Sequence, residues 1–320
     1  MVATMTAAVA GLRIRVPGKL RNLFVVVLGL MLGSAFQPEV LDHLGEWVVS
    51  LAALALYCAG AGGLGVLYFR KVCKYEPVTA YFSAMPGGLA EMVLTGTAMG
   101  GDARLISLTH GARVMLVVLC LPFAFQLFAG YEPGDRPPTG VPFAEEPILD
   151  LLVLAASGAA GYFGARALRL PAGAVLGPMV LSAGLHLAGL TTAKAPTELV
   201  AAAQVVMGSA VGARFAGTKV MEIARALFVA LGGTAILLVA AVIFAVALSA
   251  ITGLPVPELV LAFSPGGVAE MSLVAVAIGA EAPFVATHHL VRITYVVIGA
   301  PLAFRLWRRR SPPPARPSGT

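Results

Sequence analysis

The sequence predicts an all-α polytopic membrane protein built from two inverted-topology repeats. Three observations lead to this fold class: the composition, an internal duplication and the distribution of basic residues. Of the 320 residues, 58% are hydrophobic and only 12% are charged, and the mean hydropathy is +0.89. A soluble globule of this length needs more polar surface than such a chain can supply. The composition therefore indicates several membrane-spanning segments.

The sequence PGGLAEM at 86–92 returns as PGGVAEM at 265–271. When Pro86 is aligned with Pro265, the two copies match without a gap, and more than two fifths of the positions in 86–125 are identical in 265–304. Self-similarity of this kind indicates an internal repeat. We expect a first membrane repeat over 20–130, short at its N-terminus, and a second over 148–307.

Ten apolar segments can be drawn, most of them about as long as the roughly 20 residues that a spanning helix needs. They cover 20–36, 47–69, 78–100, 105–129, 148–168, 171–190, 199–215, 227–251, 256–280 and 282–307. The third and the ninth contain the Pro-Gly-Gly sequences, and the arms on each side are too short to cross a bilayer alone. Each is therefore expected as a PGG-broken helix or a re-entrant hairpin.

Lys and Arg concentrate in cytoplasmic loops, so their positions discriminate between these alternatives. If all ten segments span, 14 basic residues fall inside and 6 outside. If the third and ninth segments enter and leave on one side, 18 fall inside and 2 outside, and Arg113 and Arg292 stay in the membrane. The hairpin arrangement fits better. The two repeats then run in opposite senses through the bilayer, a plan typical of secondary transporters.

This topology fixes the remaining segments. Both termini are expected on the cytoplasmic side of a bacterial-type inner membrane, with 1–19 as an N-terminal segment and the Pro-rich 308–320 as a disordered tail. The segment 131–147 is expected as an acidic extracytoplasmic loop. The spacing Gly29-x-x-x-Gly33 predicts a close helix contact, as small residues allow in membrane helices.

Glu91 and Glu270 are the only acidic residues away from the ends of the apolar segments, since Asp150 and Glu258 lie at segment starts, and each lies five residues after the proline of a Pro-Gly-Gly sequence. An ionisable group at that depth costs at least a few kcal/mol unless it is paired or wetted, so both are candidates for a functional site. The alternative is that each carboxylate complements the dipole of a half-helix. Ser264 and Pro265 resemble the N-cap and N1 pair that would begin such a helix.

Arg113 and Arg292 follow in the next segments, with His110 and His289 three residues before them on the same helix face. Pairing each arginine with the glutamate of its repeat would leave the membrane interior neutral, so we expect two Glu–Arg ion pairs. These are either static bridges or parts of a substrate or coupling-ion site. The backbone breaks that complete this candidate site are Pro86, Gly87, Gly88, Pro265, Gly266 and Gly267.

No zinc, P-loop or hydrolase motif is present, and five scattered histidines form no ligand cluster, so no metal, cofactor or enzyme activity is expected. The glycine-rich segment 60–65 lies within an apolar span, without the βαβ context of a dinucleotide site. The net charge of +6 comes from loop clusters that orient the protein, so we expect no direct nucleic-acid binding. The expected partners are membrane lipid and a small solute, and an oligomer is possible.

At the two PGG-x-A-E-M elements and the arginine segments that follow, the chain resembles the AbrB-type membrane protein family, whose duplicated membrane domain carries both features in each half. The segment LPAGAVLGPM at 170–179 also resembles the element that opens each repeat in that family, and its counterpart before Leu20 is missing here. Family members are named regulators of gene expression or ammonia monooxygenases. The sequence contains neither a credible DNA-binding module nor a copper or iron ligand set. The repeat plan is similar to that of sodium/proton antiporters and bile-acid symporters.

Two functions from different classes remain. The first is a secondary transporter of a small solute, with a site between the two PGG elements, where half-helix N-termini provide positive dipole ends. The second is a membrane-embedded ligand sensor or regulator that affects gene expression indirectly. A pair of carboxylates suits a cation, whereas arginines and helix N-termini suit an anion, so the charge of the solute stays open.

Overall fold

The computed structural model describes residues 2–10, 12, 15–129, 141–170, 172–213 and 216–310. Every regular element in these residues is an α-helix. The helices are α1 (Val2–Val9), α2 (Gly18–Ser34), α3 (Val40–Lys71), α4 (Pro77–Ala84), α5 (Leu89–Ala98), α6 (Ala103–Ala129), α7 (Ile148–Ala167), α8 (Gly173–Leu187), α9 (Thr197–Ala213), α10 (Val220–Thr252), α11 (Val256–Phe263), α12 (Val268–Ile278) and α13 (Ala282–Arg310).

Five of the described helices, namely α3, α6, α7, α10 and α13, are long and apolar enough to cross a membrane. This agrees with the multi-pass membrane character that the composition predicted. Three other segments that were expected to span form shorter helices: α2 and α9 have 17 residues each, and α8 has 15. At 1.5 Å per residue, a helix of 17 residues is about 25 Å long.

The helix bounds follow the duplication in the sequence. Helices α2 and α9 have equal lengths and begin at equivalent positions of the two copies, and so do α4 and α11, each of 8 residues. Under the same alignment, α1 corresponds to the last turns of α8. It packs on α9 as α8 packs on α2, and Thr4 Oγ1 donates to Ser209 Oγ at 3.4 Å.

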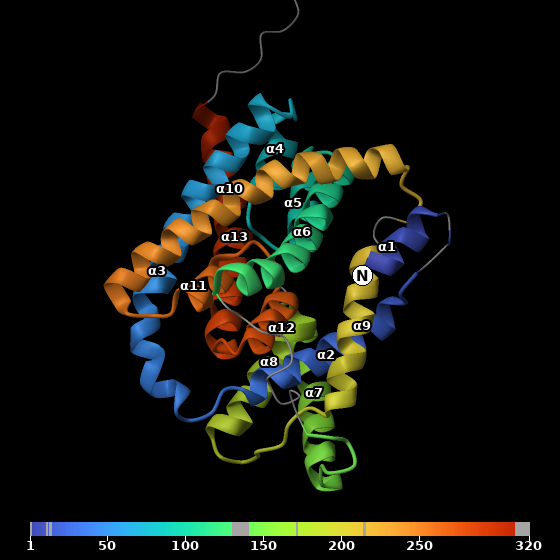
Figure 1. Ribbon diagram of the computed structural model, residues 1–320, viewed down its shortest axis with the longest axis vertical. Helices are drawn as coiled ribbons and strands as arrows, with labels where there is room; N and C mark the ends of the chain where they lie inside the picture. The colour runs from blue at the N-terminus through green and yellow to red at the C-terminus, as the bar shows by residue number, and fades with distance from the viewer. Residues whose placement is uncertain are drawn as a thin grey trace, which may run out of the picture.

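The helices form two groups (Figure 1). One contains α1, α2, α7, α8 and α9, and the other contains α3 to α6 and α10 to α13, with the long α3 and α10 side by side. The first group is packed tightly where glycines of α2 meet the backbone of α8. A Cβ atom added to Gly29 would lie 2.6 Å from the Val175 carbonyl oxygen, and one added to Gly33 would lie 2.5 Å from that of Met179. The close contact predicted from Gly29-x-x-x-Gly33 is thus confirmed, and its partner is α8.

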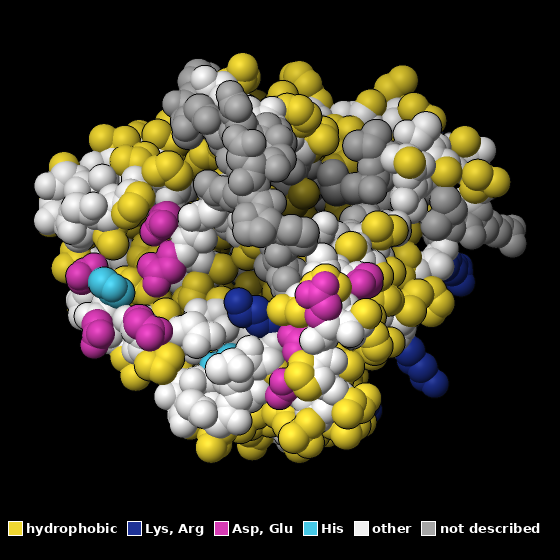
Figure 2. Space-filling model, turned by 60° about the horizontal axis from the view of Figure 1, so that its bottom comes forward, with side chains coloured by type: hydrophobic (Ala, Val, Ile, Leu, Met, Phe, Trp, Pro, Cys, Tyr) yellow, Lys and Arg dark blue, Asp and Glu magenta, His cyan; other side chains and the backbone are white. Residues whose placement is uncertain are grey.

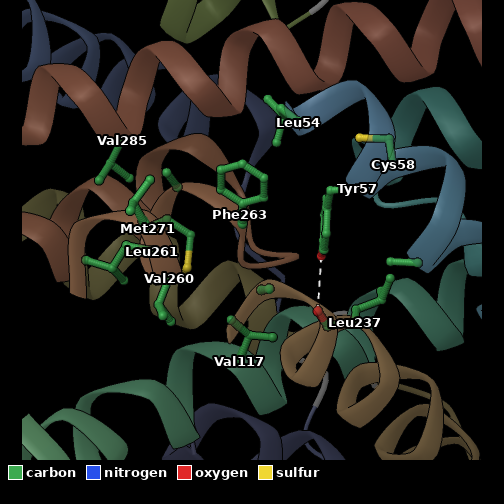
Figure 3. Close-up of a cluster of buried hydrophobic side chains, with 14 of the residues drawn as sticks. Leu54, Tyr57, Cys58, Val117, Leu237, Val260, Leu261, Phe263, Met271 and Val285 are labelled. Atoms are coloured by element: carbon green, nitrogen blue, oxygen red, sulfur yellow. Dashed lines mark hydrogen bonds between the residues drawn. The ribbon is translucent and has the colours of Figure 1, made fainter. Parts of the chain in front are cut away.

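The core of the second group contains residues from both halves of the chain (Figure 3). Leu54 and Tyr57 of α3 lie among side chains of α6, α10, α11, α12 and α13. Tyr57, which is fully buried, donates from its hydroxyl to the carbonyl of Leu237 at 3.2 Å. Next to this core, the prolines of the two breaks, Pro86 and Pro265, are buried, and the last glycines, Gly88 and Gly267, are half-buried.

Candidate functional site

Each Pro-Gly-Gly sequence separates two helices. The flanking helix ends are Ala84 and Leu89 in the first half and Phe263 and Val268 in the second. Met85 and Ser264, which precede the prolines, leave the helical conformation with ψ angles of 133° and 141°. The proline ring disfavours the helical region for the residue before it, so the breaks follow directly from the sequence.

The expectation that Ser264 and Pro265 begin the second helix is wrong. Ser264 caps the end of α11, and its hydroxyl donates back to the carbonyl of Val260 at 2.6 Å. The N-cap of α12 is Gly267, and the N-cap of α5 is its counterpart Gly88. A serine hydroxyl can bind a carbonyl of the preceding turn in place of an N–H of the helix that follows. The Ser264 hydroxyl makes the first of these two bonds.

The two arms of each broken segment fold back on each other. The backbone N–H of Asp102, at the start of α6, donates to Thr79 Oγ1 at 3.0 Å, so the chain returns to the level at which α4 began. In the second half, the N–H of Glu281 donates to Oε1 of Glu258 at 3.2 Å. These two contacts join equivalent positions of the duplication. Each Pro-Gly-Gly break is therefore the tip of a helical hairpin.

Two buried arginines hold the hairpin tips. Arg113 donates from Nη1 to the carbonyl of Met85 at 3.0 Å and from Nη2 to that of Gly87 at 3.3 Å. Arg292 donates in the same way to the carbonyls of Ser264 and Gly266. The arginines are only 4% and 2% exposed. Each guanidinium thus binds two carbonyls of the broken segment, and one of them, the Ser264 carbonyl, also accepts from the N–H of Gly266 at 2.9 Å.

The histidines extend this arrangement differently in the two halves. Arg113 Nη2 donates to Nδ1 of His110 at 2.7 Å, because arginine has no acceptor. In neutral His110, Nε2 therefore carries the proton and donates to the carbonyl of Phe82 at 2.8 Å. His289 is also fully buried. Its ring lies near the backbone of Leu261, the counterpart of Phe82, but neither ring nitrogen forms a hydrogen bond of ordinary geometry.

The expected Glu–Arg ion pairs are not formed. Within the residues that the structure describes, the ion pairs are His43–Glu46 and Arg104–Glu222, and both lie at helix ends. Glu91 is instead the third residue of α5, and its carboxylate folds back over Gly88, where a Cβ atom would collide with Oε2. The ion pairs were predicted because the sequence identifies charged side chains. The acceptors that the arginines bind are backbone carbonyls of the broken segments, which residue types do not reveal.

Glu270 repeats this geometry over Gly267 at the start of α12. Each hairpin therefore has a cation at the C-terminal end of its first arm and an anion at the N-terminal start of its second. Both charges complement the dipole of the adjacent helix end. The expectation that the glutamates sit at half-helix N-termini agrees with these positions, and their part in substrate or ion binding stays a prediction.

Glu270 also lines a cavity of about 390 Å³ between α6, α9 and α12. The other polar side chains of its lining are Gln126 and Gln204, and the rest is apolar apart from Gly208. These two glutamines were not among the residues predicted for the site from the sequence. A search for uncharged amides within the apolar segments 105–129 and 199–215 would have found them.

The fold and these breaks define an all-helical protein of membrane character with two similar halves. The chain belongs to the AbrB family, whose description is transition state regulatory protein AbrB and whose family model matches residues 1–308. The chain is 28% identical over 298 residues to a Bacillus subtilis protein named "Uncharacterized protein YhjN", and the matched region covers 88% of this chain and 77% of that protein. It is 25% identical over 306 residues to the Escherichia coli "Putative regulator AbrB", covering 95% and 87%.

Proposed function

We propose that the protein is a secondary transporter of a small solute, with its site beside the hairpin tips of two inverted-topology repeats. The observation that carries this proposal is the duplicated arrangement of a buried arginine and a first-turn glutamate at each tip. Irregular backbone at membrane depth is tolerated where it is buried in protein or lines a cavity. Helix ends beside such breaks are where secondary transporters bind solutes and coupling ions.

Contacts between distant helix ends support the topology in which both hairpins are re-entrant. On the side assigned to the cytoplasm, Arg104 pairs with Glu222, and Arg70 lies over the ring of Trp307 at 5.5 Å. On the opposite side, the N–H of Thr197 donates to the carbonyl of Val141. Each of these contacts joins residues that the positions of Lys and Arg place on the same side of the membrane.

The distribution of acidic residues supports the same assignment. Figure 2 shows groups of Asp and Glu side chains on one face of the molecule, where few Lys and Arg side chains are seen. Acidic residues at helix starts assigned to the extracytoplasmic side include Asp42, Asp150, Glu198 and Glu258. With this topology, α2 leads outward and its counterpart α9 leads inward, so the two halves are inverted.

A membrane-embedded sensor or regulator is the second candidate. The family description and the name of the Escherichia coli relative both contain a regulatory term, and such a protein could bind a ligand at the same hairpin tips. Flux separates the two functions, because a sensor binds its ligand without moving it across the membrane.

The experiment uses the purified protein in proteoliposomes with an imposed proton or sodium gradient and a panel of labelled small solutes. We expect gradient-driven accumulation of one solute class, and we expect Glu91→Gln and Glu270→Gln to abolish it while the folded protein remains in the membrane. Glu198→Gln is the matched control, since Glu198 is also a first-turn glutamate but lies outside the hairpins. Normal accumulation by both hairpin variants would reduce Glu91 and Glu270 to helix caps.

A further inference from the structure

The lining of the cavity between α6, α9 and α12 includes an acidic side chain. Among the described residues that line it, the single ionisable side chain is the Glu270 carboxylate, and none is Lys, Arg or His. A carboxylate among apolar groups is costly unless a positive group or hydrogen-bond donors accompany it. Arg292, the basic residue expected to pair with it, is occupied by the carbonyls of Ser264 and Gly266. Within the described residues, the positive group next to the Glu270 carboxylate is thus the N-terminal end of α12, a partial charge that a cationic guest would supplement.

Gln126 and Gln204 add hydrogen-bonding groups to this cavity. They come from different helices, α6 and α9, and each amide offers two N–H donors and one acceptor oxygen. Gln126 is half-buried and Gln204 is exposed, and a few polar groups in a largely apolar site usually fix the orientation of a ligand. A volume of about 390 Å³ gives room for roughly a dozen groups of the size of water, at about 30 Å³ each.

The duplication does not preserve this lining. The positions that align with Gln126 and Gln204 in the other copy are Arg305 and Val25, whereas Glu270 corresponds to Glu91. The combination of two amides and one carboxylate is therefore a property of the α6–α9–α12 cavity and does not come with the hairpin itself. The lining differs between the halves although the hairpin geometry is shared.

We propose that this cavity is the solute site and that its solute is a small organic cation with N–H donors, which Glu270 neutralises and Gln126 and Gln204 orient. The proposal rests on the transporter function for the fate of the bound cation, but its chemistry can be measured without transport. In the proposed topology, the cavity lies between the hairpin tip and the extracytoplasmic ends of α6 and α12, so the cation would enter from that side.

The test places a cysteine at Gln204 in a protein whose three native cysteines are replaced by alanine. The purified protein in detergent is treated with two methanethiosulfonate reagents, one bearing a trimethylammonium group and the other a sulfonate group. Thr192→Cys, at an exposed position outside the cavity, gives the reference rates. We expect the cationic reagent to be favoured about tenfold over the anionic one, relative to that reference.

Glu270→Gln should abolish this preference, and Glu91→Gln, the matched change in the other hairpin, should leave it unchanged. Gln126→Glu adds a second carboxylate to the lining and should increase the preference, so the test remains decisive if Glu270→Gln does not fold. A preference for the anionic reagent, an equal rate for both, or a cysteine that reacts with neither would overturn the proposal.

A second measurement identifies the charge of the guest. 5-Aminopentan-1-ol, pentane-1,5-diol and 5-hydroxypentanoate have similar lengths and differ at one end in carrying a positive charge, no charge or a negative charge. We expect only the amine to slow the labelling of the Gln204→Cys protein. Equal protection by the diol, or protection by none of the three, would contradict a cation site. Because these measurements need no flux, their failure would leave the transport proposal to the proteoliposome experiment.

Discussion

Arg113 and Arg292, which occupy equivalent positions of the duplication, bind equivalent carbonyl pairs: the first binds Met85 and Gly87, and the second binds Ser264 and Gly266. The pattern requires a fork of two N–H donors that reaches two carbonyls at once, which a guanidinium supplies and an ammonium does not. Because this contact is present in both halves, the hairpin and the following helix form one structural unit in each.

Replacing the fork by a single point charge should loosen the hairpin tip. We expect Arg113→Lys and Arg292→Lys each to lower the free energy of unfolding by about 1–3 kcal/mol, since at least one buried carbonyl loses its partner. Thermal unfolding in detergent measures this loss as a lower Tm. Arg305→Lys in α13 is the control, because Arg305 is exposed and should tolerate the change. Equal Tm values for Arg305→Lys and Arg292→Lys would argue against a structural role of the fork.

The absence of an ion pair between Glu91 and Arg113 leads to a prediction about their coupling. The changes Glu91→Gln and Arg113→Ala should have additive effects on the free energy of unfolding, within about 0.5 kcal/mol. A double-mutant cycle by chemical or thermal unfolding checks this. A double variant that is milder than the sum by about 1 kcal/mol or more would restore the pairing inferred from the sequence.

The crossing of α7 and α8 should be the place least tolerant of added volume. A Cβ atom on Gly161 would lie 2.5 Å from the carbonyl oxygen of Gly177, a backbone atom that cannot move away alone. Gly161→Ala should therefore cost about 1–3 kcal/mol through overpacking. Gly164→Ala, one turn further along α7 and in open space, should be neutral or stabilising by up to about 1 kcal/mol. Unfolding of both variants in parallel measures the difference.

Topology can be tested by the accessibility of engineered cysteines in whole cells. In a cysteine-free background, a cysteine at Glu145 should react with an impermeant thiol reagent, and one at Lys71 should be shielded until the membrane is permeabilised. Both positions are exposed in the structure, so a difference reports the side of the membrane. Labelling of Lys71→Cys but not of Glu145→Cys would contradict the proposed orientation.

An acidic group outside the spans should make stability depend on pH. Burial raises the pKa of the Glu281 carboxyl, and the nearby charge of Glu258 raises it further. The folded protein then binds a proton more tightly than the unfolded chain. The stabilisation is complete at low pH and is lost as pH rises from the unfolded value, about 4.3, through the raised folded value.

We therefore expect the Tm of the protein to fall as pH rises through this window, and Glu281→Gln to fall less. His43 and Glu46 also face Glu281, and they act in opposite directions on its pKa. Asp42→Asn, an exposed acidic position in the first turn of α3, serves as the control. A steeper fall of Tm for Glu281→Gln than for the unchanged protein would contradict a raised pKa of the Glu281 carboxyl in the folded protein.

The helix breaks and the long helices could be predicted because their determinants are local. Both Pro-Gly-Gly sequences end a helix, whereas Pro122, Pro178 and Pro301 lie inside helices, and apolar length indicates the long helices. The partner of Arg113 could not be read in this way, since choosing between Glu91 and two backbone carbonyls requires the three-dimensional path of the tip. Gln126 and Gln204 were missed for a related reason. They carry no charge, and only the fold brings them to one cavity.

The contacts that bind each hairpin to the next helix span little of the chain: Asp102 and Thr79 are 23 residues apart, and Arg113 and Met85 are 28 apart. Tyr57 and Leu237, which join the halves, are 180 apart. Closing short loops costs less entropy and occurs earlier, so each hairpin unit can assemble soon after it leaves the ribosome. The face of α3 around Tyr57 stays uncovered until α10 has been synthesised. Until then the newly made first half has an uncovered core, and the membrane or a chaperone has to shelter it during synthesis of the second.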